Sequence, residues 1–171
     1  MSHIAFCTAS SVSQANTIVD RLKASGISNE HISVVMADND KTRQFAVENE
    51  TKAPEGAVTG GTTGMAIGGT LGWLTGIGAL AIPGLGPLIA AGPIMAALSG
   101  AAAGGLVGGI TGALIGMGIP EYEAKTYEDR LQRGDAIVTV TTHSVEDNAR
   151  VERIFADAGA ENISSSNGVA V

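Results

Sequence analysis

The sequence is poor in the residues from which catalytic, redox and metal centres are commonly built. It holds one cysteine, Cys7, and three histidines, His3, His31 and His143, in 171 residues. A single cysteine excludes an internal disulfide and a zinc site made from cysteines. The histidines have no neighbour at metal-ligand spacing, so they are interpreted as ordinary polar residues. Cys7 is interpreted as a small buried side chain rather than a nucleophile.

Basic residues are also few. The chain has 10 Lys and Arg against 17 Asp and Glu, which gives a net charge of −7. Nucleic-acid binding needs clustered Lys and Arg, so nucleic acid is excluded as the main partner, and so is a polybasic anchor to a membrane surface. No signal peptide is visible at the N-terminus. We therefore expect the polar parts of the chain to lie in the cytoplasm.

No motif of a known catalytic chemistry is present. The phosphate-loop pattern GxxxxGK[ST] is missing, and residues 104–109 lack the strand context and the later acidic residue of a dinucleotide loop. Glu121, Glu123, Glu128 and Asp129 are interpreted as a solvated helix face. We expect a protein that is not an enzyme, with no catalytic, cofactor-binding or metal-binding residues and no cofactor.

Residues 56–120 contain no charged side chain and are rich in glycine. This stretch holds twenty of the 24 glycines, and many recur at every fourth position. Residues four apart stack on one face of an α-helix, so each series predicts a smooth groove for close helix packing, as in GxxxG motifs. The predicted packing and oligomerisation residues are Gly60, Gly64, Gly68, Gly72, Gly76, Gly100, Gly104, Gly108, Gly112 and Gly116.

The uncharged stretch predicts a helical hairpin. Its arms are Ala57–Ala81 and Ile94–Ile119, each roughly 37 Å long at ~1.5 Å per residue and so able to cross a ~30 Å hydrocarbon layer. Between them, prolines and glycines prevent a continuous helix. The predicted turn residues are Pro83, Gly84, Gly86, Pro87 and Pro93.

Both arms are apolar nearly all round, so something must cover them. Glycine costs ~1 kcal/mol relative to alanine in a helix, and close packing along the grooves is the expected compensation. A small polar domain cannot cover two such helices, so the partner is either the lipid bilayer or other copies of the chain. Membrane insertion with a cytoplasmic head is the first expectation, and a soluble assembly with a shared apolar core is the alternative.

The two ends of the chain resemble copies of one strand–helix–strand unit. Ser11 corresponds to Ser144 and Gly26 to Gly159 at a constant offset of 133 residues. Two such units predict an α+β fold, a ferredoxin-like βαβ…βαβ sandwich with the glycine-zipper hairpin inserted between its halves. The expected division is 1–55 for the first half with a short polar helix, 56–120 for the hairpin, and 121–171 for an amphipathic helix and the second half.

Four segments resemble the bacterial general-stress or heat- and cold-induced protein family, which joins a small α/β domain to a glycine zipper. They are residues 55–61, 79–87, 90–93 and 116–128, and the most specific run is Gly-Ile-Pro-Glu-x-Glu-Ala-Lys-x-Tyr-Glu at residues 118–128. The resemblance implies a stress-associated protein, often membrane-bound, with no known activity or cofactor.

These observations predict a self-associating structural or protective protein whose main partner is itself, with the bilayer as the second expected partner. A different hypothesis treats the polar domain as a sensor of an unknown small molecule, and it rests on fold analogy alone.

Overall fold

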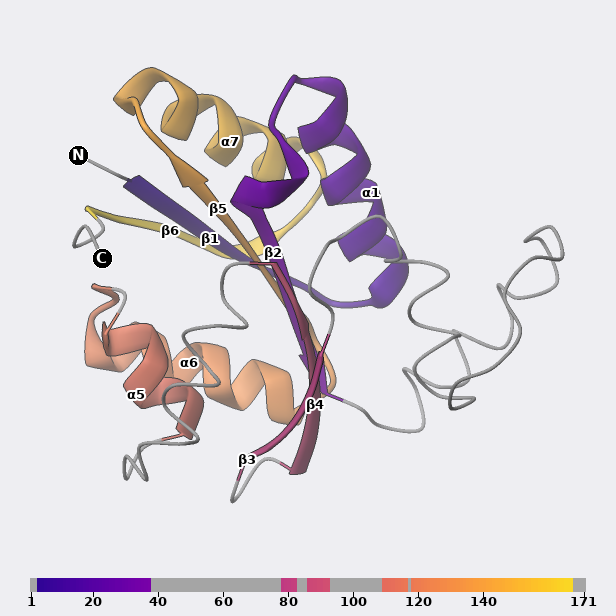
Figure 1. Ribbon diagram of the computed structural model, residues 1–171, viewed down its shortest axis with the longest axis vertical. Coiled ribbons are helices and arrows are strands. Elements are labelled where there is room, and N and C mark those ends of the chain that lie inside the picture. The colour runs from indigo at the N-terminus through magenta and orange to yellow at the C-terminus, as the bar shows by residue number, and fades with distance from the viewer. Residues whose placement is uncertain (1–2, 38–77, 83–85, 93–108, 117, 168–171) are drawn as a thin grey trace, which may run out of the picture.

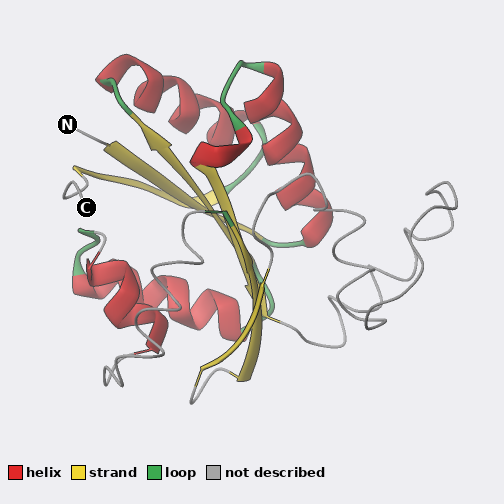
Figure 2. Cartoon of the chain, viewed as in Figure 1, coloured by secondary structure: helices red, strands yellow, loops and turns green. Residues whose placement is uncertain are grey.

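The computed structural model describes residues 3–37, 78–82, 86–92, 109–116 and 118–167 (Figure 1). These residues form a mixed α/β fold with one antiparallel sheet of six strands in the order β3-β4-β2-β5-β1-β6. Helices lie on both faces of the sheet (Figure 2). The elements are β1 His3–Ala9, α1 Val12–Ala24, η1 Asn29–His31 (a 3₁₀ helix), β2 Ile32–Ala37, β3 Gly78–Ile82, β4 Gly86–Ala91, α5 Gly109–Gly116, α6 Glu121–Gln132, β5 Ala136–Thr142, α7 Val145–Asp157 and β6 Glu161–Asn167.

The two strand–helix–strand units predicted at the ends of the chain are present as β1–α1–β2 and β5–α7–β6. Their helices begin at the same kind of cap: the Ser11 hydroxyl accepts from the Gln14 N–H at 3.1 Å, and the Ser144 hydroxyl accepts from the Asp147 N–H at 3.0 Å. Both helices are followed by a glycine with positive φ, Gly26 at 92° and Gly159 at 72°. These local signals explain why the elements were predictable.

The two units share one sheet. β5 lies between β2 and β1, and β6 pairs with the other edge of β1, each pair antiparallel. α1 and α7 cover one face of these strands (Figure 1). Their apolar side chains, Ile18, Leu22 and Phe155 among them, fill a core against that face. The repeat thus produces an intertwined arrangement rather than two separate lobes.

The prediction that the first helical arm extends to Ala81 is wrong. Residues 78–82 and 86–91 are the strands β3 and β4, which pair with each other from Gly78 opposite Ala90 to Ile82 opposite Gly86. The chain does reverse between Ile82 and Gly86, but as a β-hairpin. Of the predicted turn residues, Gly86 and Pro87 lie in β4.

Pairing with β2 explains this outcome. β4 lies along the outer edge of β2, with Ala91 opposite Val34 and Leu88 opposite Ala37. Without β4 that edge would leave the backbone N–H and C=O groups of a buried strand without partners. Pro87 precedes the part of β4 that pairs with β2, so its missing N–H does not interrupt that ladder.

The prediction of a helix through Ile119 is also corrected. α5 ends at Gly116, where Gly118 adopts φ 89° and the Ile119 N–H donates to the Leu114 carbonyl at 3.1 Å. α5 and α6 lie on the sheet face opposite α1 and α7 (Figure 1). A second core forms there, to which the uncharged stretch contributes Leu88, Ala90, Ile110, Leu114 and Ile119. The polar domain therefore covers these parts of the stretch, contrary to the expectation that it could not.

Several predictions fall outside the described residues. They concern the glycines from Gly60 to Gly76 and from Gly100 to Gly108, the turn residues Pro83, Gly84 and Pro93, and the short polar helix expected at the end of residues 1–55. Among the helices that the structure describes, none has the length and apolar character needed to cross a bilayer.

Candidate functional site

Helix α5 presents two different faces. Ile110 and Leu114, four residues apart, are each 1 % exposed and pack into the second core. Gly112 and Gly116, also four apart, lie on the opposite side of the helix. Beyond the neighbouring residues and the backbone of its own helix, a Cβ atom added to either glycine would meet no atom within 4 Å. Among the described residues, these two members of the predicted glycine series are therefore not used for close packing.

A large apolar side chain borders this glycine face. Ile115 precedes Gly116 and is 42 % exposed, which places it among the exposed large hydrophobic residues. We call Gly112, Ile115 and Gly116 the glycine face of α5. It carries no charge, no nucleophile and no titratable group, so its chemistry is limited to apolar contact and close backbone approach.

The glycine face rests on a well-anchored helix. The Thr111 hydroxyl donates a hydrogen bond to the Glu128 carboxylate on α6. The last turn of α5 is closed by the Gly118 N–H, which donates to the Ile115 carbonyl at 2.9 Å. α5 is thus held against α6 and the sheet with its smooth side turned outward.

A second feature is a cleft of about 210 Å³ between α6 and β6. Its floor is Tyr127, whose hydroxyl donates to the Asn162 carbonyl at 2.7 Å and lies 2.6 Å from the Ser164 hydroxyl oxygen. Burial raises the pKa of the Tyr127 phenol above its usual range. The neutral phenol therefore acts as a hydrogen-bonding anchor between α6 and β6 rather than as an acid or base.

The rim of the cleft is more open. Tyr122 is 72 % exposed, and its hydroxyl donates to the Glu123 carboxylate at 2.8 Å. That hydrogen bond raises the pKa of Tyr122. The cleft is smaller than the ~300–1,000 Å³ usual for ligand pockets.

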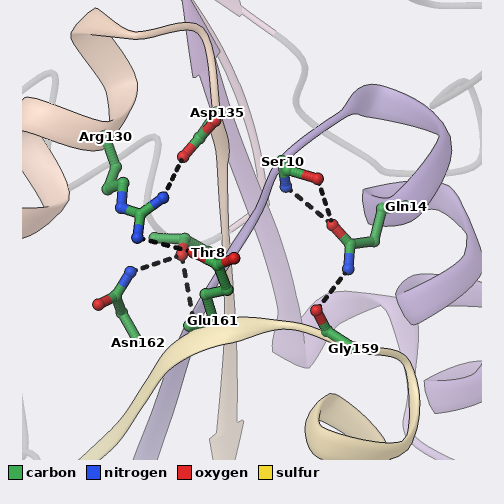
Figure 3. Close-up of polar contacts among 8 residues, drawn as sticks. All are labelled: Thr8, Ser10, Gln14, Arg130, Asp135, Gly159, Glu161 and Asn162. Atoms are coloured by element: carbon green, nitrogen blue, oxygen red, sulfur yellow. Dashed lines mark hydrogen bonds and ion pairs between the residues drawn. The ribbon is translucent and has the colours of Figure 1, made fainter.

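A polar network beside this cleft fixes the start of β6 (Figure 3). Asn162 has φ 48°, a conformation uncommon outside glycine, and its side-chain N–H donates to the Thr8 hydroxyl at 3.0 Å. Thr8 in turn donates to the Glu161 carbonyl at 3.0 Å. Arg130 pairs with the Glu161 carboxylate at 2.7 Å and with Asp135 at 3.3 Å. The network joins α6, β1 and β6.

The same view shows how α1 holds the end of α7 (Figure 3). The Gln14 amide donates to the Gly159 carbonyl at 2.7 Å and to the Ala158 carbonyl at 3.1 Å, while its oxygen accepts from the Ser10 N–H at 2.8 Å. These carbonyls would otherwise lack partners at the helix end. This contact too stabilises the fold.

The cysteine and histidines have different outcomes. Cys7 is fully buried, and burial raises the pKa of its thiol, so its interpretation as a core side chain is confirmed. His31 and His143, in contrast, are brought together with ring centroids 5.3 Å apart. Sequence spacing could not reveal this pair because the two residues are joined only by the pairing of β2 with β5. Within the described ranges, no three His, Cys, Asp or Glu side chains gather closely enough to hold a metal ion.

Comparisons of the chain with protein-family models, with curated proteins and with solved structures found no match. Membership of the general-stress family therefore stays a prediction based on the sequence segments quoted above.

Proposed function

We propose that this chain is a non-enzymatic, self-associating protein whose copies pack through the glycine face of α5. One observation carries the proposal: an added Cβ at Gly112 or Gly116 would meet open space, beside the exposed Ile115. Each glycine costs its helix ~1 kcal/mol relative to alanine, and nothing in the described part of the chain uses the missing side chains. Close approach by another helix is the compensation that fits.

The glycine spacing of this surface continues in the sequence beyond α5. The four-residue spacing of Gly112 and Gly116 continues upstream through Gly108, Gly104 and Gly100. In the proposed assembly all five glycines contribute to the contact between copies. Many weak contacts repeated along one groove suit a structural or protective role in stress better than a catalytic one.

The proposed framework for this surface is a ferredoxin-like core. The strand order β2-β5-β1-β6, all antiparallel, with α1 and α7 on one face, supports that assignment. The β3–β4 hairpin extends the sheet beyond β2, and α5 and α6 cover the second face. In this proposal the β3–β4 hairpin, α5 and α6 carry the function, and the ferredoxin-like core positions them.

The contact is proposed to form between copies in water, with the lipid-inserted form as the alternative. A two-span hairpin with its turn at residues 82–93 would place that turn across the bilayer from the polar domain. β4 instead pairs with β2 within the sheet of that domain. The position of β4 therefore favours protein rather than lipid as the cover for the glycine face.

The test is the mass of the tag-free chain, purified without detergent and measured by light scattering. We expect a multi-copy particle for the wild type and a clearly smaller species for the double variant Gly112→Leu/Gly116→Leu, because the added side chains fill the groove. Ala149→Leu, on the exposed side of α7, is the matched control and should keep the wild-type mass. A folded, monodisperse single chain for the wild type would refute the proposal, and recovery only in detergent would select the lipid-inserted form.

A further inference from the structure

The three histidines of the chain lie at the same end of three neighbouring strands. His3 begins β1 opposite Thr142, the last residue of β5, and His143 follows directly. His31 immediately precedes β2, whose first residue, Ile32, lies opposite Val140 of β5. Antiparallel pairing thus gathers side chains that are far apart in the sequence.

Two of them are in direct contact. The His31 and His143 rings are 5.3 Å apart between centroids and stand edge to face at 86°. His143 is exposed and His31 is half-buried, so water and ions reach the pair. The His31 backbone is held by its N–H, which donates to the Ser28 carbonyl at 3.0 Å.

This spacing matches that of two imidazoles sharing one metal ion. Zinc–nitrogen bonds of ~2.0–2.1 Å at a tetrahedral angle place the two ring centroids about 5 Å apart. The two ring centroids already stand at that distance. Coordination also requires rotation about the side-chain bonds, because the rings now stand edge to face and one nitrogen of each must turn toward a common point. The supporting strands β2 and β5 are central in the sheet and need not move.

We propose that His31 and His143 form a binding site for a borderline divalent transition metal such as Zn²⁺. Imidazole nitrogen favours such ions over Mg²⁺ and Ca²⁺, which take oxygen ligands. Two protein ligands leave the remaining coordination positions to water, since no third His, Cys, Asp or Glu joins them within the described residues. The site therefore binds its ion reversibly and contributes less to folding than a closed four-ligand site does.

The experiment measures Zn²⁺ binding by titration calorimetry on the tag-free full chain, with Co²⁺ absorption as a second readout of imidazole coordination. We expect one Zn²⁺ per chain and visible d–d bands for Co²⁺, with no heat from Mg²⁺. His31→Gln and His143→Gln should each weaken Zn²⁺ binding at least about tenfold, because loss of a ligand costs no less than loss of a supporting residue.

His3→Gln is the matched control, because His3 lies at the same end of the sheet but outside the ring pair. It should leave the Zn²⁺ affinity unchanged. Circular dichroism in the presence of a chelator checks that each variant is folded, and an additional His31→Asn/His143→Asn variant must also lose the site. No Zn²⁺ binding by the wild type, equal losses in the His3 variant, or retained binding in the His31 and His143 variants would each overturn the proposal.

Discussion

At the scale of single residues, the two tyrosines of the α6–β6 cleft differ in how much their hydroxyl hydrogen bonds contribute to stability, because one is buried and the other is exposed. Both hydroxyls donate hydrogen bonds, but Tyr127 is 1 % exposed and Tyr122 is 72 % exposed. In water the lost bond of an exposed hydroxyl is replaced by a bond to solvent, whereas a buried partner left alone keeps its desolvation cost.

Tyr127→Phe should therefore lower the free energy of unfolding by about 1–3 kcal/mol, because the Asn162 carbonyl and the Ser164 hydroxyl lose their partner. Tyr122→Phe is the matched control and should change stability very little. Urea unfolding followed by circular dichroism measures both. Equal effects of the two substitutions would show that the Tyr127 hydroxyl does not anchor β6.

Cys7 makes the free energy of unfolding depend on pH in the alkaline range. Its folded-state pKa is raised by burial, so the unfolded thiol, with a pKa of about 8.5, loses its proton first. The stability contributed by the neutral thiol is complete below that pH and is lost as pH rises above it. We expect the free energy of unfolding to fall from about pH 8 upward, and Cys7→Ala to show a flatter profile in urea titrations at several pH values. A profile unchanged by the substitution would contradict this linkage.

At the scale of elements, α5 places apolar side chains on the face that meets the sheet and glycines on the opposite face. Ile110 and Leu114 hold it in place, and Gly112 and Gly116 carry no side chain on the outside. A helix that met only water there would gain stability from alanine at the glycine positions. The effect of alanine on self-association, rather than on the stability of the dispersed chain, therefore distinguishes an interface from a free surface.

Gly112→Ala should raise the free energy of unfolding of the dispersed chain by up to about 1 kcal/mol while weakening self-association. Urea unfolding at low protein concentration gives the first quantity, and sedimentation over a concentration series gives the second. Ala149→Gly in α7 is the opposite control: it should lower stability and leave the assembly unchanged. Stronger assembly of Gly112→Ala would contradict the proposed contact.

At the scale of the whole molecule, the described parts of the uncharged stretch share the sheet and the second core with the polar units. β4 pairs with β2, and Leu88 is 0 % exposed in the same cluster as Phe6 and Ile137 of the two end units. A destabilising substitution in this part of the stretch should therefore lower the stability of the whole domain rather than that of a separate hairpin.

Leu88→Ala should lower the free energy of unfolding by about 2–5 kcal/mol, because it leaves a cavity in the second core. The loss should be seen in a single cooperative transition of the whole described fold. Ile115→Ala, on the outer face of α5, should cost little stability and instead reduce the particle mass. A Leu88→Ala variant as stable as the wild type would mean that β4 is not part of the core.

The glycine face and the histidine pair differ in how far the sequence could predict them. The four-residue spacing of Gly112 and Gly116 is visible directly, because helical neighbours are close in sequence. The contact of His31 with His143 depends on the register of β2 with β5, which no local pattern encodes. The interpretation of the histidines as ordinary polar residues, drawn from their sequence spacing, did not include this contact for that reason.

The sequence alone determined the strands and helices of the two end units, because serine caps, terminal glycines and apolar periodicity act over a few residues. Only the tertiary structure decided that residues 78–82 and 86–91 are strands. Runs of glycine, alanine and leucine fit helix or strand, and the buried outer edge of β2 requires backbone partners that β4 supplies. It also decided which side of α5 faces outward, because that choice depends on the apolar face of the sheet that Ile110 and Leu114 cover.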